Sequence, residues 1–380
     1  MKKIKKYVKE KMKYFIYFLT ICVNKYFLYR NIRRTLKNTP QTIPVTKEKK
    51  QEYIKRWSKL GGSTSLLWYK ACMNITGVDD TAYISEPDYY HKVELILNNK
   101  IFNYAYCDKN NYHKLIDNSI LPKVYVRNIE GAYYNSDYKA INDSAEILNM
   151  IPEHADRVIV KTAVGSCGGK SIQLFRKDKD VWSNSSGEKL TVAYLETNYK
   201  KNFLIQEYIR QHPFYSKFNE SSVNTIRLFT YRSVINNEII VLRAMLRIGK
   251  KGSSVDNIFS GGICCNIDQD GKLGEYAIGA KHLKIYEFND LVFKNVGKLY
   301  NIEEVKNTAK AIAGSFLYHR LIGFDFCVDE NSKVILIEAN LYDIGISHQM
   351  LSGPLFREYT DEIIEYCARN KKTISFDFDL

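Results

Sequence analysis

The sequence predicts an α+β protein in which a helical front part precedes a mainly antiparallel sheet region. Helical periodicity dominates up to about residue 122, and short Val- and Ile-rich runs separated by turn residues follow. A run of helices followed by a run of strands is typical of this fold class. We therefore expect four parts: a basic helical segment (1–37), a mostly helical region (38–122), a smaller sheet subdomain (123–205) and a larger one (206–380).

The first 37 residues predict a basic amphipathic helix. Residues 14–23 form an apolar run that is too short to span a bilayer, and no small-residue cleavage site follows it. We expect a helix that lies in the plane of an anionic membrane, on the cytoplasmic face. The alternative is a helix that packs on the body with a solvated basic face. The apolar residues at helical spacing are Ile4, Val8, Met12, Phe15, Leu19, Val23 and Tyr26.

The charge distribution argues against a nucleic-acid-binding protein. Residues 1–37 hold twelve basic residues and one acidic residue, and thus eleven of the fourteen net positive charges of the chain. A nucleic-acid enzyme usually carries a basic stripe on its folded body, whereas the remainder here is nearly neutral. The eight cysteines show no CxxC pair or zinc-ligand spacing, which fits the reducing cytosol.

The elements follow in order after a linker at residues 39–44, where two prolines stop any helix. Helical periodicity marks residues 47–60, 87–98 and 109–117, and Leu121-Pro122 ends the last of these. A later helix is expected at 303–319. Strands are expected at 123–129, 157–162, 171–176, 203–209, 225–233, 238–247, 322–328 and 333–339.

Polar residues on the last two strands predict a metal site. Asp325 lies in an apolar strand, and Glu338 and Asn340 are two residues apart on the next one. Because side chains alternate along a strand, Glu338 and Asn340 share a face, and a hairpin would bring Asp325 to the same side. Such oxygen ligands suit magnesium ions that bridge ATP phosphates. The alternative is a set of surface-facing polar residues.

A lysine and a glycine-rich loop predict a phosphate-binding flap. Lys161 ends a strand, and the next segment contains Gly165, Ser166, Gly168, Gly169 and Lys170. Glycines let backbone N–H groups approach phosphate oxygens, although an ordinary glycine-rich turn is the alternative. The apolar strand at 203–209, which contains Gln206-Glu207-Tyr208-Ile209, could offer backbone groups to an adenine ring or be a plain core strand.

Taken in order, these motifs resemble ATP-grasp enzymes such as D-alanine–D-alanine ligase. The resemblance covers about residues 105–360. Four further segments are similar to the sugar-transfer-associated ATP-grasp proteins found among bacterial surface-polysaccharide genes. These segments are His212-Pro213, Asn224-Thr225-Ile226-Arg227, Val255-Asp256-Asn257 and Ser260-Gly261-Gly262.

The resemblance implies a fold of two α+β subdomains that clasp ATP, and it implies roles for single residues. Lys109 and Lys161 would bind ATP, the glycine loop would close over its phosphates, and Gln206 to Ile209 would form the adenine and ribose hinge. Arg227, and Arg247 with it, would stabilise the transferring phosphoryl group together with Lys161. Asp325, Glu338 and Asn340 would hold two magnesium ions. Where many relatives have Asn-Pro, this chain continues from Asn340 into Leu341, which leaves the substrate open.

The expected function is an ATP- and Mg²⁺-dependent ligase that joins a carboxylate to an amine through an acylphosphate, in the modification or assembly of a bacterial surface polysaccharide. Its substrate would be a small molecule or saccharide with a carboxylate. Two alternatives remain: a sugar kinase on the same fold, and a non-catalytic assembly or binding protein. Polar loop residues are candidate substrate contacts, with turns and strand ends as the alternative. They are His212, Asn224, Asp256, Asn257, His348 and Gln349.

Overall fold

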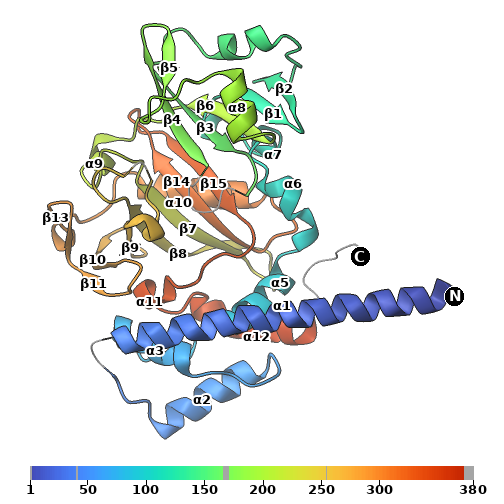
Figure 1. Cartoon of the computed structure of the whole chain (residues 1–380). Helices are drawn as coiled ribbons and strands as arrows, with labels where there is room; N and C mark the ends of the chain where they lie inside the picture. Colours follow the sequence, from blue (N-terminus) through green and yellow to red (C-terminus); the bar gives the residue numbers. More distant parts are fainter. Residues whose placement is uncertain (1, 40–41, 166–170, 254, 372–380) are drawn as a thin grey trace.

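A computed structural model describes residues 2–39, 42–165, 171–253 and 255–371. Two antiparallel sheets lie one above the other, and a layer of helices from the N-terminal part of the chain lies beneath the larger sheet (Figure 1). This arrangement confirms the predicted fold class: α+β, antiparallel sheets and a helical N-terminal region.

The smaller sheet has six strands in the order β2-β1-β6-β3-β4-β5. Its apolar face packs on helix α8, where Leu195 meets Val158 and Val160 in one buried cluster. Strand β6 pairs with both β1 and β3, so it forms the centre of this sheet and continues to Glu207. The elements are β1 (Val124–Ile129), β2 (Ala132–Asn135), β3 (Arg157–Thr162), β4 (Ile172–Asp178), β5 (Val181–Ser183), α8 (Val192–Asn198) and β6 (Phe203–Glu207).

The larger sheet has seven strands in the order β11-β10-β9-β8-β7-β14-β15. Alternate residues of β7 point to opposite faces, as the period of a strand requires. Ile226 and Leu228 pack towards helix α10, whereas Phe229 and Tyr231 pack towards the N-terminal helices. The elements are α9 (Pro213–Ser216), β7 (Thr225–Arg232), β8 (Ile239–Ile248), β9 (Ile263–Ile267), β10 (Leu273–Ile278), β11 (Lys284–Ile285), α10 (Ile302–Ala313), β14 (Leu321–Val328) and β15 (Val334–Asn340); β12 (Glu287–Phe288) and β13 (Leu291–Val292) form a separate ribbon.

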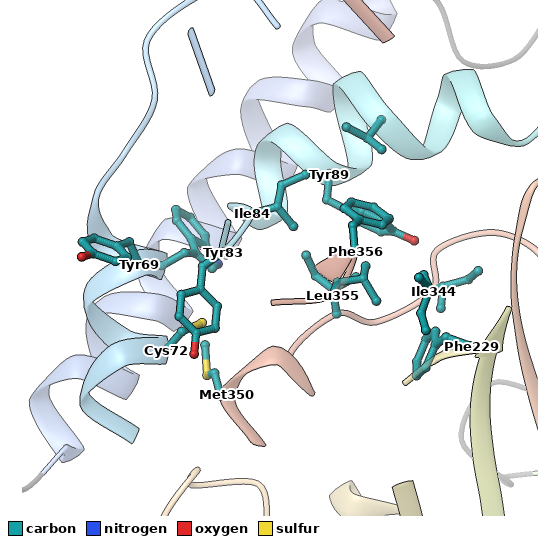
Figure 2. Packing of buried hydrophobic residues seen from close by; sticks show 14 of the residues in the cluster. Tyr69, Cys72, Tyr83, Ile84, Tyr89, Phe229, Ile344, Met350, Leu355 and Phe356 are labelled. Carbon is teal, nitrogen blue, oxygen red and sulfur yellow. The ribbon is translucent and has the colours of Figure 1, made fainter. Parts of the chain in front are cut away.

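The N-terminal helices pack on the larger sheet through a large apolar cluster. In Figure 2, Tyr83 and Cys72 from the N-terminal part of the chain lie near Met350, and Phe229 of the larger sheet lies beside Ile344. This burial fixes the segment that follows β15 against the rest of the protein. The helices are α1 (Lys2–Asn38), α2 (Lys47–Ser58), α3 (Leu67–Thr76), α4 (Glu86–Asp88), α5 (Leu95–Leu97), α6 (Asn103–Cys107), α7 (Tyr112–Leu115), α11 (Gln349–Ser352) and α12 (Thr360–Arg369), with a π-helical segment (Tyr89–Glu94) between α4 and α5.

Two helices are shorter than the periodicity predicts. The helix expected at 109–117 is reduced to α7, because the Asp108 carboxylate accepts a hydrogen bond from the N–H of Asn110 and folds residues 108–111 into a turn. The helix expected at 303–319 ends at Ala313, next to Gly314, and a tighter turn follows. Glycine has a low helix propensity, which explains this end.

Candidate nucleotide and metal site

The three predicted metal ligands lie together on two neighbouring strands. In the β14–β15 pair, Asp325 is opposite Glu338, and Gly323 is opposite Asn340. The Asn340 amide donates to the carbonyl of Gly323 (3.0 Å) and lies 3.4 Å from Asp325 Oδ2. The hairpin therefore brings two carboxylates and one amide to the same face of the larger sheet.

Two arginines bind the buried carboxylate of Asp325. Arg227, its neighbour on β7, donates from Nε to Oδ1 (2.7 Å) and from Nη2 to Oδ2 (2.5 Å). Arg247 of β8 adds a third bond from Nη1 to Oδ2 (3.1 Å). Burial alone would raise the pKa of Asp325, which is 3% exposed, but the two guanidinium groups hold that pKa below its ordinary value.

Asp256 extends this network and positions Arg247. It lies 3.2 Å from Arg247 Nη2 and accepts hydrogen bonds from the backbone N–H and the hydroxyl of Thr225. Burial opposes the charge on Arg247, but Asp256 and Asp325 raise its pKa above the ordinary value. A Cβ on Gly262 would lie 2.8–2.9 Å from three backbone oxygens, two of them in residues 256 and 257, so only glycine fits beside this loop.

Two lysines approach the carboxylates from the other side. Lys109 Nζ lies 2.8 Å from Glu338 Oε1, and its backbone N–H donates to Ala163 just after β3. Lys161 of β3 is 5% exposed. Burial, with Lys109 nearby, lowers the pKa of Lys161 to about 7. The structure thus brings together Lys109, Lys161, Arg227, Arg247, Asp325, Glu338 and Asn340 in one charged network.

The chemistry of this set fits magnesium, although protein cations bind its oxygens here. Within the described residues, no group of three or more His, Cys, Asp or Glu side chains is placed to hold a metal. The set consists instead of two carboxylates and an amide, which are oxygen donors of the kind that Mg²⁺ takes along with ATP phosphates. Lys109 is paired with the Glu338 carboxylate, and Arg227 is paired with the Asp325 carboxylate.

The residues predicted to form the hinge lie where the two sheets meet. Gln206 and Glu207 end β6, and Ile209 packs on Cys327 and Ile335 of the larger sheet. A cavity of about 240 Å³ adjoins Tyr208 and Ile209. A smaller one of about 10 Å³ has walls from both sheets, and its lining includes Lys109, Lys161, Gln206, Leu336 and Ile337.

The predicted flap can be followed only at its start. Gly165 has a φ of +69°, a conformation that favours glycine. The predicted phosphate-binding residues Ser166, Gly168, Gly169 and Lys170 lie outside the described residues.

The candidate substrate contacts fall into two groups: Asp256, Asn257 and His348 form the first, and the side chains of the other three hold loops and helices in place. Asp256 belongs to the charged network, and Asn257 adjoins it in the same loop. His348 is 5% exposed, its ring stacks on Phe229, and burial lowers its pKa to about 3.

The other three candidates have structural partners. His212 accepts the N–H of Phe214 at the start of α9 and stacks on Tyr300. Asn224 donates to Gln211 and to the carbonyls of Tyr215 and Asn219, and Gln349 bonds both backbone groups of Ile84. These bonds tie loops and helices to the sheet.

Sequence reasoning missed a buried polar group beside the lysines. Arg127 of β1 and Lys161 of β3 both lie opposite Leu204, so they share the face of the smaller sheet that carries Lys161. Arg127 is fully buried, and its guanidinium lies over the ring of Tyr138. Nη1 donates to the carbonyl of Asn110, whereas Nε and Nη2 have no hydrogen-bond partner among the described residues. An arginine inside the apolar run 124–129 is the signal that could have found it.

Two antiparallel sheets bring buried lysines from one side against carboxylates and arginines on the other, which is the arrangement expected of an ATP-grasp protein. The sequence matches the family described as sugar-transfer associated ATP-grasp over residues 89–363, more than half of the chain, and the chain therefore belongs to that family. The predicted family is confirmed. No curated protein gives a significant match.

Solved structures with some similarity are ATP-grasp enzymes at low identity. The biotin carboxylase domain of 2-oxoglutarate carboxylase from Hydrogenobacter thermophilus, in complex with MgADP, is 16% identical (69% of this chain, 45% of that chain, TM-score 0.40). D-alanine–D-alanine ligase from Coxiella burnetii is 12% identical (70% and 58%, TM-score 0.37), and N5-carboxyaminoimidazole ribonucleotide synthetase from Thermotoga maritima is 10% identical (64% and 44%, TM-score 0.33). The chain spans about half the length of these proteins.

Proposed function

We propose that the protein is an ATP- and Mg²⁺-dependent ligase that activates a carboxylate as an acylphosphate and joins it to an amine. The observation that carries the proposal is the charged network itself. The ion pair between Lys109 and Glu338 links the side that carries Lys161 to the face that carries Asp325 and Arg227. Cations and carboxylates concentrated at one buried point are what the transfer of a phosphoryl group requires.

In the first step, an oxygen of the substrate carboxylate attacks the γ-phosphorus of ATP. The new O–P bond forms as the bond to the β,γ-bridging oxygen breaks, which gives the acylphosphate and ADP. Lys161 and Arg227 would neutralise the charge that develops on the transferring group, while Arg247, held by Asp256, keeps the arginine pair in place. Lys161 is itself buried, which would keep water from its ammonium group.

In the second step, the amine nitrogen attacks the acyl carbon, and the C–O bond to phosphate breaks. The amide, inorganic phosphate and a proton are the products. Phosphate is a far better leaving group than oxide, which is the reason for the first step.

Asp325, Glu338 and Asn340 would hold Mg²⁺, and we propose two ions. The metal would supply positive charge to the ATP phosphates. Gln206, Glu207, Tyr208 and Ile209 would form the hinge for adenine and ribose. Asp256, Asn257 and His348 would contact the substrate, and His212 and Asn224 would shape the adjoining loops.

The proposed setting is the modification or assembly of a bacterial surface polysaccharide, with a carboxylate-bearing saccharide or small molecule as substrate. The family description, sugar-transfer associated ATP-grasp, supports this setting. We also propose a cytoplasmic protein that is peripheral on the inner face of the membrane. None of the helices in the described part of the chain is long and apolar enough to cross a bilayer.

The test is incubation of the full chain with ATP, Mg²⁺ and a panel of uronic acids and amino acids, with hydroxylamine added to trap an acylphosphate as the hydroxamate. Release of phosphate and a hydroxamate identified by mass spectrometry are expected with one carboxylate. A stable phosphoester with ADP would instead identify a kinase. Turnover that survives the combination of Asp325→Asn with Glu338→Gln would contradict the proposed mechanism.

A further inference from the structure

One side of α1 carries a stripe of exposed apolar side chains. At 100° per residue, six of them fall within an arc of about 80°. Each is between 46% and 63% exposed. These residues, here called the α1 stripe, are Val8, Met12, Phe15, Leu19, Val23 and Tyr26.

The stripe faces away from the protein body. The other side of α1 docks through its C-terminal half, where Ile32 is buried and Leu28, Tyr29 and Leu36 pack against the apolar cluster under the larger sheet. The Asn24 side chain lies 3.0 Å from His91 Nε2 on the body. In Figure 1 the N-terminal half of α1 extends well beyond the body. Contiguous exposed apolar patches on a folded protein mark interaction surfaces.

Basic residues continue the stripe along the same side of the helix. Arg30, Arg33 and Lys37 follow Tyr26 at intervals of four, three and four residues, and all three are exposed. Residues 1–37 carry twelve basic residues against one acidic residue. A second copy of α1 would be basic at both ends like the first. The two helices would therefore repel each other in a parallel and in an antiparallel arrangement. An anionic lipid surface takes both the apolar and the basic part.

We propose that the α1 stripe binds an anionic membrane surface, with α1 lying in the plane of the interface and the protein body on its cytoplasmic side. The apolar side chains of the stripe enter the boundary between headgroups and acyl chains, and Arg30, Arg33 and Lys37 contact lipid phosphates. A helix of this length is about 55 Å long. Docking of its C-terminal half fixes the body, and hence the charged network, relative to the membrane. This inference deepens the proposed location but does not depend on the ligase reaction.

The test measures binding of the full chain to vesicles of equal phosphatidylglycerol and phosphatidylcholine by sedimentation, with pure phosphatidylcholine vesicles for comparison. We expect binding to the anionic vesicles that weakens strongly in 0.5 M salt. The combined variant Phe15→Ser, Leu19→Ser, Val23→Ser should lower the partition coefficient by about thirtyfold or more, because three apolar side chains stay in water. Its matched control replaces three apolar residues elsewhere that are even more exposed, Ile101→Ser, Ile235→Ser, Leu317→Ser, and should bind like the unaltered chain.

Charge reversal provides the second arm. Arg30→Glu with Arg33→Glu and Lys37→Glu should lower binding to anionic vesicles by roughly a hundredfold or more, since each of the three basic residues near the surface contributes about 1 kcal/mol and about 1.4 kcal/mol is a tenfold change. The same reversal at three exposed lysines of the body, Lys139, Lys179 and Lys294, should have little effect. Thermal unfolding of every variant checks that the body remains folded.

Three results would overturn the proposal. One is that the chain binds neutral and anionic vesicles equally, or binds neither. Another is that the stripe variant and its control lose the same amount of vesicle binding. The third is a dimer by light scattering that the stripe variant converts to a monomer while vesicle binding is unchanged, which would assign the stripe to a second copy. None of these results bears on ATP turnover, so the ligase proposal stands or falls separately.

Discussion

The ion pair between Arg227 and Asp325 gives the sharpest quantitative prediction about the unliganded protein. Asp325→Asn keeps the shape of the side chain and removes its charge, whereas Arg227→Met keeps an unbranched apolar stem. Each change leaves one charged partner buried, which costs about 3–5 kcal/mol in folded proteins. Each single variant should therefore lose about 3 kcal/mol of unfolding free energy. In Arg227→Met, Arg247 still contacts the carboxylate of Asp325.

The coupling between the two residues can be worked from their geometry. Two charge-assisted bonds of 2.7 and 2.5 Å join the side chains, and the carboxylate is 3% exposed. Two unit charges about 4 Å apart interact by roughly 4 kcal/mol at an effective dielectric constant of 20. We therefore expect a coupling energy of about 2–4 kcal/mol.

Urea unfolding of the four proteins of a double-mutant cycle at pH 7, without nucleotide or magnesium, measures this coupling. The control cycle uses the exposed pair Lys251 and Asp290, 3.4 Å apart, where the coupling should be close to zero. Because Asp325 has a lowered pKa, its contribution is complete above about pH 4 and is lost as the pH falls further. The deficit of Asp325→Asn should shrink accordingly in acid. Additive single effects, or a deficit that grows in acid, would refute the reasoning.

Three further predictions concern single residues. The pKa of Lys161 is lowered to about 7, so the unfolded chain binds more protons than the folded one between about pH 7 and 10, and stability should rise over that range. In thermal unfolding, Lys161→Met should flatten this dependence of stability on pH. An unchanged slope of stability against pH would contradict the prediction. Glu94 accepts the N–H of Ile344, and burial raises its pKa to about 7, so stability should fall as the pH rises from 4.5 to 7. Glu94→Gln should therefore be more stable than the natural chain at pH 8 by about 1–3 kcal/mol. A variant that is less stable than the natural chain at pH 8 would contradict the prediction. Gly262→Ala should lower the free energy of unfolding in urea by about 2 kcal/mol or more, because the new Cβ would meet backbone oxygens. Gly345→Ala is the control and should change the free energy of unfolding little, because the space around Gly345 is open. Equal effects of the two substitutions would contradict the prediction.

The face that carries the three candidate metal ligands could be predicted from sequence because it depends on local rules. Asp325, Glu338 and Asn340 lie on two strands joined by a short turn, and alternation along a strand fixes their common side. The same rules predicted the stripe on α1, whose members recur at helical spacing. Patterns within one element, or within one hairpin, carry this information in the sequence itself.

Contacts between distant segments could not be predicted in this way. Lys109 contacts Glu338, which is 229 positions away in the sequence, and no local pattern around either residue predicts this pairing. The binding of Arg227 to Asp325 and the burial of Arg127 beside Lys161 likewise follow from the order of strands in the sheets. Turn chemistry at Asp108 overrode the helical periodicity that follows it, which is why that helix is shorter than expected.

Calorimetric titration of the full chain with ATP, in the presence and absence of magnesium, tests the central claim most directly. The account predicts binding that magnesium strengthens, and predicts that Asp325→Asn combined with Glu338→Gln abolishes the magnesium dependence. A natural chain that binds no nucleotide, or a double variant that binds with the same affinity and the same magnesium dependence, would contradict it.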